Sequence, residues 1–179
     1  GKQSITLQNF PHIFNGNIVQ VYLSSDLTKN TDLITALSSL QSSLRYMNIE
    51  IKFVDEIPSS GDTLIISTFS LDEDTQAIAD KFDVEFGSSI KTVEFGEVSS
   101  SGTGVFLLQT TSKGNTLILL AGSAEDVISM IGLVSAGNIN SCLTAEKIAI
   151  CSVGFGGSDF YFDEEDSFEK PPTDELTPE

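Results

Sequence analysis

The sequence predicts an α/β fold in which a mixed β-sheet is covered by about three helices. The strongest indication is the stretch 115–134, where the apolar run Leu117–Ala121 is followed by a Gly-Ser turn and then by apolar residues at helical spacing. Between residues 93 and 121, three apolar runs are separated only by short turns. Hairpin links force antiparallel pairing, so the predicted sheet is mixed and not all parallel.

The first half of the chain is predicted to contain three strands and two helices. In order, these are a strand over Ile18–Leu23, a helix from Thr31 or Asp32, strands over Ile49–Val54 and Thr63–Ser67, and a helix over Leu71–Phe82. The first helix carries one apolar stripe, formed by Leu33, Leu37, Leu40, Leu44 and Met47. The second helix begins with acids, which the positive end of a helix dipole favours: Asp72, Glu73 and Asp74.

The second half is predicted to contain four strands and one helix. These are strands over Val93–Val98, Gly104–Thr110 and Thr116–Ala121, a helix from Ala124 to about Gly137, and a final strand over Lys147–Val153. Ser123 is the expected N-cap of this helix. Apolar runs that alternate with amphipathic segments make the predicted fold flavodoxin-like and Rossmann-like in part.

Length and composition indicate a single α/β domain over residues 1–153, followed by an extended acidic tail or linker that contains Gly and Pro, residues 154–179. The chain has 179 residues, 40% of them hydrophobic, which suffices for a real core. Its net charge is −17, of which residues 159–179 carry −8, with nine acids and Lys170. This charge repels nucleic acid and anionic lipid. No apolar run approaches the roughly 20 residues of a membrane helix, so we expect no membrane insertion.

Few residues are suited to catalysis. The single histidine, His12, lies in an apolar lead without a nucleophile motif, and Arg45 is the single arginine. The glycines around 102–104 and 154–157 lack the strand and helix that flank a nucleotide-binding loop. We therefore expect no catalytic residues, no bound cofactor and no enzyme activity. A small hydrolase that uses Asp72 or Asp74 is the enzymatic alternative.

Two groups of residues leave alternatives open. The acids Asp163, Glu164, Glu165 and Asp166 offer oxygen ligands for calcium, although they lack the spacing of a calcium loop, and solvated charge is the other interpretation. Cys142 and Cys151 are either two buried thiols or a disulfide that closes a small loop. A disulfide would place the protein outside the cytoplasm. With one histidine and no second cysteine pair, the chain lacks the usual ligands of a zinc site, so we expect none.

The acidic tail also contains aromatic residues, Phe160, Tyr161, Phe162 and Phe168. One interpretation is a flexible stalk. The other is an arm that lies across a neighbouring subunit, with residues 159–168 ordered by that contact and the chain from Pro171 onward extended. In that case, deletion of residues 159–179 weakens self-association without unfolding the domain.

Two segments resemble archaeal surface-layer (S-layer) proteins. Ile5-Thr-Leu-Gln-Asn-Phe-Pro-His-Ile-Phe, followed by the strand from Ile18, is similar to the opening of those proteins. Thr116-Leu-Ile-Leu-Leu-Ala-Gly-Ser-Ala-Glu-Asp-Val is similar to their segment of a hydrophobic strand, Ala-Gly and Ala-Glu-Asp-Thr. The family's Gly-Gly-Pro turn is replaced here by Ser67-Thr-Phe-Ser70.

This resemblance implies an extracellular, cell-surface structural protein or domain, one that assembles with itself or with other surface proteins and has no catalytic site. A second expectation is an accessory binding module of an extracytoplasmic polysaccharide-handling system. The strand, Ala-Gly turn and helix also resemble flavodoxin-like domains of cellulose-synthase periplasmic subunits and N-terminal domains of some glycosidases.

Overall fold

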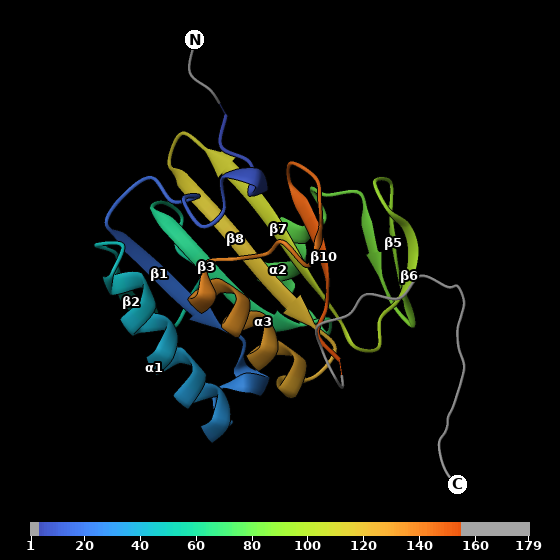
Figure 1. Ribbon diagram of the computed structural model, residues 1–179, viewed down its shortest axis with the longest axis horizontal. Coiled ribbons are helices and arrows are strands. Elements are labelled where there is room, and N and C mark those ends of the chain that lie inside the picture. The colour runs from blue at the N-terminus through green and yellow to red at the C-terminus, as the bar shows by residue number, and fades with distance from the viewer. Residues whose placement is uncertain (1–3, 155–179) are drawn as a thin grey trace, which may run out of the picture.

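The computed structural model describes residues 4–154 and consists of layers around a central sheet (Figure 1). The strands of this sheet are β1 (Ile18–Leu23), β2 (Glu50–Val54), β3 (Asp62–Thr68), β7 (Thr103–Thr111), β8 (Gly114–Ala121), β9 (Leu143–Thr144) and β10 (Ile148–Ser152). They are arranged in the order β2-β1-β3-β8-β7-β10-β9. The first four strands are parallel and the remaining pairings are antiparallel, so the predicted mixed sheet is confirmed.

Each face of the sheet is covered by different elements. On one face lie the helices α1 (Thr31–Arg45) and α3 (Ala124–Ala136), together with the N-terminal segment. On the other face lie the helix α2 (Glu73–Ala79) and a small antiparallel sheet of β4 (Val84–Phe86), β5 (Ser89–Thr92) and β6 (Gly96–Ser99). The helices α1, α2 and α3 thus correspond to the three predicted helices.

The central strand β8 illustrates why the sheet is buried on both faces. Leu117 and Leu119 belong to the core beneath α1 and α3, whereas Ile118 and Leu120 belong to the core beneath α2 and the small sheet. Alternate side chains of a strand point to opposite faces, so a continuous apolar run serves both cores. This burial is the principal stabilisation of the fold.

Local signals set the ends of the two long helices. The Ser123 side chain caps α3, accepting from the backbone N–H of Asp126 at 3.2 Å, as expected. Gly137 ends α3 in the left-handed conformation that glycine tolerates best. Asn30, and not Thr31 or Asp32, caps α1 by accepting from the backbone N–H of Leu33 at 2.9 Å.

Three predicted details are wrong. The expected strand Val93–Val98 is the turn and second half of the β5–β6 hairpin, because Gly96 adopts a φ of 74° and reverses the chain there. The strands β4, β5 and β9 were not predicted; they have three, four and two residues, too few for a visible alternation. The helix expected over Leu71–Phe82 is limited to α2, seven residues.

Candidate functional site

The first place to look for a ligand is the carboxyl end of the parallel strands, between β1 and β3. From β1 the chain crosses through α1 to β2 on one side, while β3 lies on the other side. Open α/β sheets bind ligands in the crevice at such a reversal of strand order.

Polar residues of the chain itself bridge the two strands at this point. Asp26 accepts hydrogen bonds from the hydroxyls of Ser24, at 2.6 Å, and Thr68, at 3.1 Å. Ser24 is buried, and its backbone N–H donates to the Ile66 carbonyl at 3.0 Å. This network connects the loop after β1 to the end of β3. Each carboxylate oxygen of Asp26 already accepts a hydrogen bond from within the chain.

The N-terminus of α3 follows β8 and is the usual place for an anion in this fold. Here the first turn carries Glu125 and Asp126. Desolvation raises the pKa of Asp126, although the hydrogen bond with Ser123 lowers it. Because both carboxylates oppose a second negative charge, this helix end is poorly suited to a phosphate or carboxylate ligand.

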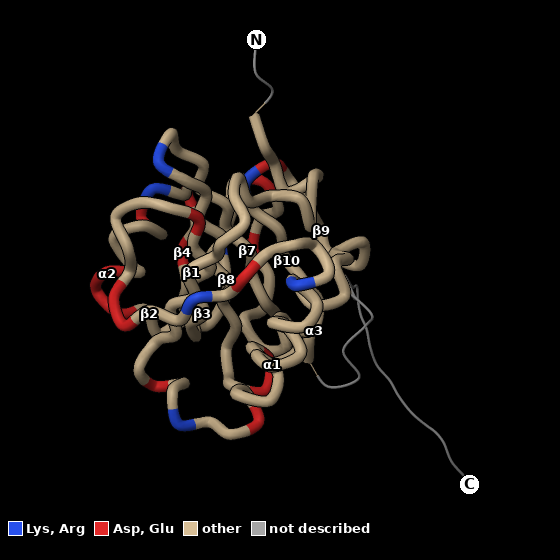
Figure 2. The backbone as a smooth tube through the Cα atoms, turned by 90° about the vertical axis from the view of Figure 1, so that its left-hand side faces the viewer, with Lys and Arg blue, Asp and Glu red and all other residues tan. Residues whose placement is uncertain are grey.

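Asp72, one of the acids at the start of α2, has a structural role. Its Oδ1 accepts from the backbone N–H of Thr75 at 2.8 Å, and its Oδ2 accepts from the Tyr22 hydroxyl at 2.6 Å. Burial alone would raise the pKa of Asp72, but the hydrogen bonds from Tyr22 and Thr75 outweigh it and lower the pKa. The same bond raises the pKa of Tyr22 to about 12. Acidic residues gather at α2 in Figure 2.

The other sequence candidates lie apart from this edge. His12 is exposed in the N-terminal segment. Gly102 makes a turn, with a φ of 69°, and its carbonyl accepts from the backbone N–H groups of Val153 and Gly154 at 2.8 and 3.0 Å. Within residues 4–154, no group of three or more His, Cys, Asp or Glu could hold a metal ion. The calcium candidates Asp163, Glu164, Glu165 and Asp166, and the aromatic arm, lie outside the described residues.

The two cysteines are brought together at the far edge of the sheet. Cys151 is fully buried in β10, and its sulfur is bonded to that of Cys142, which precedes β9, with the Cα atoms 4.3 Å apart. The bond joins the short strand β9 to the sheet. Asn140, two residues before Cys142, is exposed.

A groove of about 680 Å³ lies beside this disulfide, between the N-terminal segment and the end of α3. Its lining includes the amide side chains of Gln8, Asn138 and Asn140 and the ring of Phe10. Amides together with an aromatic surface suit a neutral hydroxylated ligand better than a charged one.

The N-terminal segment is joined to β8 by a buried polar cluster, which sequence reasoning missed. Asn115 is 2% exposed, and its side-chain amide donates to the Ile13 carbonyl at 2.8 Å. The Asp62 carboxylate accepts from the backbone N–H groups of Asn115, at 2.9 Å, and Gly16, at 2.7 Å. Leu7 and Ile13 fill the core beneath this cluster. The segment is therefore an integral part of the domain.

The two edges of the sheet differ. The edge at β9 is two residues long and is held by the disulfide, whereas the edge at β2 is five residues long and bears exposed Phe53. Figure 2 looks onto the side of the molecule at which β2 lies.

No helix within residues 4–154 is long and apolar enough to cross a membrane.

Comparison with known proteins identifies the fold but not a family. No family model and no curated protein matches the sequence. The solved structure of CpGH84D is similar over 79% of this chain, with a TM-score of 0.51 and 11% sequence identity. The chain spans 21% of that protein's length. At this identity, the similarity establishes the α/β fold alone.

Proposed function

We propose that this chain is a non-catalytic structural domain of a cell-surface assembly and that it associates with copies of itself. The proposal starts from the resemblance of residues 5–14 and 116–127 to archaeal S-layer proteins. Such a domain works through its surfaces and needs no active site.

The observation that carries the proposal is that the two resembling segments contribute to the same part of the fold. Ile13, in the first segment, accepts a hydrogen bond from Asn115, which immediately precedes the second. In the core, Leu7 of the first segment and Leu117 and Leu119 of the second belong to one cluster. Residues that resemble one family in two separate places thus form one structural unit, which favours a common origin over chance similarity.

Two further features agree with an extracellular location. The Cys142–Cys151 bond is of the kind that persists outside the cytoplasm. The net charge of −17 keeps single copies apart at low ionic strength, so assembly becomes dependent on salt or on a divalent cation.

Electron microscopy of the purified full chain, with and without calcium, tests this proposal. We expect ordered sheets or filaments at high protein concentration, promoted by salt or calcium. A chain that stays monomeric in sedimentation velocity under all these conditions would refute it.

A second candidate function is that of an accessory module that binds polysaccharide. Two observations favour it: the similarity to CpGH84D, whose name marks it as a glycoside hydrolase, and the amide-lined groove beside Phe10. A glycan array tests it, with Asn138→Ala as the groove variant and Asn15→Ala, at an exposed position outside the groove, as the matched control. Selective binding lost only in Asn138→Ala would support this function. The absence of selective binding by the parent chain would count against it.

A further inference from the structure

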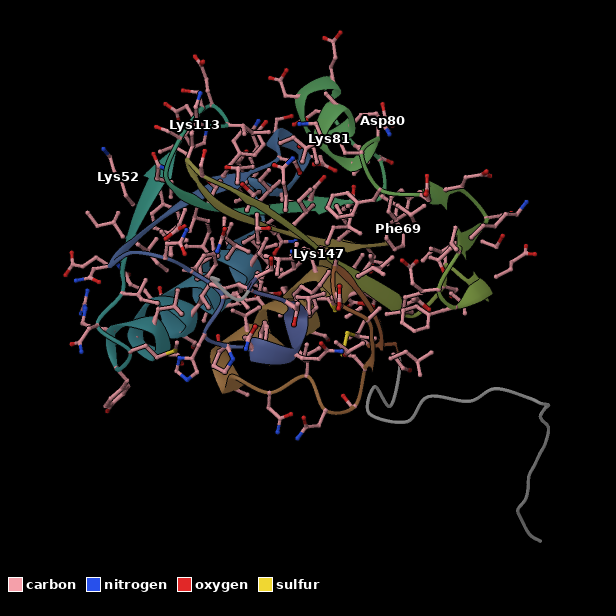
Figure 3. All side chains as sticks on the ribbon, turned by 90° about the horizontal axis from the view of Figure 1, so that it is seen from above. Lys52, Phe69, Asp80, Lys81, Lys113 and Lys147 are labelled. Atoms are coloured by element: carbon pink, nitrogen blue, oxygen red, sulfur yellow. A yellow bond between two sulfur atoms is a disulfide. The ribbon has the colours of Figure 1, made fainter. Side chains whose placement is uncertain are left out.

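We propose that the β2 edge pairs antiparallel with the β2 edge of a second copy, around a two-fold axis at Ile51, so that two seven-stranded sheets become one. This inference rests on the proposed self-assembly and names its surface and register. Lys52, in the middle of β2, lies at the outer limit of the molecule in Figure 3.

The backbone of β2 determines which residues are able to pair. The Glu50 N–H donates to the Asn17 carbonyl at 2.8 Å, on the β1 side, and within residues 4–154 β1 is the single strand that pairs with β2. In a parallel strand, the N–H and C=O of one residue point to the same side and alternate along the chain. The backbone N–H and C=O groups of Lys52 and Val54 therefore point toward β1, as those of Glu50 do. The N–H and C=O groups of Ile51 and Phe53 point outward.

Outward groups restrict the register to a few choices. A two-fold pairing needs outward residues opposite outward residues, so Ile51 lies opposite Ile51, Phe53 or Ile49 of the second copy. The Ile49 N–H already donates to the Leu44 carbonyl at 3.0 Å, which leaves only the Ile49 carbonyl for an intermolecular bond. Pairing around Ile51 then offers four hydrogen bonds, two at the axis and one from each Phe53 N–H to an Ile49 carbonyl.

The charges of the neighbouring residues select among these registers. Around Ile51, each Glu50 lies opposite Lys52 of the other copy, which makes two pairs of opposite charge. A shift of one step toward the C-terminus sets Lys52 opposite Lys52, and a shift of one step toward the N-terminus sets Glu50 opposite Glu50. Like charges directly opposite each other destabilise a sheet, so the register around Ile51 is preferred.

Apolar side chains on the α1 face agree with this register. Ile49 and Ile51 belong to or pack against the core beneath α1, whereas Phe53, on the same face of the strand, is 53% exposed. In the pair, Phe53 lies opposite Ile49 of the second copy, which covers part of its ring. Edges that must stay single are shortened, covered, interrupted by proline or given charged side chains. The charged residues of β2, Glu50 and Lys52, have opposite signs and lie opposite each other in this register, so here they favour pairing. The edge at β9 is short, but β2 has five residues and no proline.

Cysteine cross-linking of the full chain maps the register. The two Ile51 Cα atoms in a hydrogen-bonded pair lie about 5.5 Å apart, within reach of a disulfide. We expect Ile51→Cys to form a covalent dimer under mild oxidation. Lys52→Cys and Glu50→Cys are the matched variants for the neighbouring registers, and the parent chain controls for exchange with its own disulfide. Preferential cross-linking of either neighbour would overturn the proposal.

Charge reversal provides a test that does not depend on an added cysteine. Glu50→Lys and Lys52→Glu each place like charges opposite one another twice, and we expect either to weaken dimerisation about tenfold or more in sedimentation equilibrium. The double variant restores both pairs and is expected to return to within about threefold of the parent chain.

The outcomes separate this inference from the proposed function. If the chain assembles in electron micrographs but neither single charge reversal changes its dimerisation, the inference is wrong and assembly uses another surface. If the parent chain is monomeric throughout, both the inference and the proposed function fail.

Discussion

Asp62→Asn tests how firmly the N-terminal segment is held in the domain. The carboxylate is 5% exposed and accepts from two backbone N–H groups, of Gly16 at 2.7 Å and Asn115 at 2.9 Å. An amide retains one acceptor oxygen and turns its NH₂ group toward the other N–H. A hydrogen bond to a charged group contributes about 1.5–3 kcal/mol, so the loss of one bond and the weakening of the other cost about 2–4 kcal/mol.

Urea unfolding of the full chain, followed by circular dichroism, measures this loss. With a urea slope of about 2 kcal/mol per M, the midpoint for Asp62→Asn is expected to fall by about 1–2 M. Asp55→Asn changes the net charge equally at an exposed position and is expected to alter the free energy of unfolding by less than about 0.5 kcal/mol. Equal midpoints for the two variants would refute the role assigned to Asp62.

Three further predictions concern other parts of the fold. The pKa of Tyr22 is about 12 in the folded chain and about 10 in the unfolded chain, so the protonated hydroxyl stabilises the folded state. This contribution to the free energy of unfolding is complete below pH 10 and is lost between pH 10 and 12. Tyr22→Phe should flatten the stability profile over this range in chemical denaturation, whereas Tyr46→Phe, at an exposed position, should not. Reduction of the disulfide should lower the free energy of unfolding by about 2–3 kcal/mol, as expected for a short loop, and a Cys142→Ala variant should be insensitive to reductant in the same thermal scan. Gly114→Ala should destabilise by about 2 kcal/mol or more in urea, because its φ is 143° and a Cβ would meet the backbone of the β2–β3 turn; unchanged stability would contradict that contact.

Local sequence patterns predicted the central elements well. The apolar run of β8, the Gly-Ser turn and the helical spacing in α3 lie next to one another in the chain, so no long-range information is needed to interpret them. The β5–β6 hairpin was missed for the opposite reason. Val93 is 77% exposed, and apolar residues at a turn imitate a strand. The fold class was therefore predictable, whereas the second sheet was not.

The candidate surfaces depend on contacts that a single sequence does not reveal. Asp62 and Asn115 are 53 positions apart, and Asn115 and Ile13 are 102 apart. The predicted strand Ile49–Val54 gave no sign that it lies at the edge of the sheet, because edge position follows from the order of all the strands. Glu50 and Lys52 acquire significance only once that order is known.

Amide hydrogen exchange across β2, measured by NMR on the full chain at low and high protein concentration, tests the central claim most directly. The Glu50 and Lys52 amides face β1 and should be protected at both concentrations. The Ile51 and Phe53 amides face outward and should exchange rapidly in the monomer, then become protected as the chain self-associates. Rapid exchange of Ile51 and Phe53 in the assembled protein would contradict assembly through this edge.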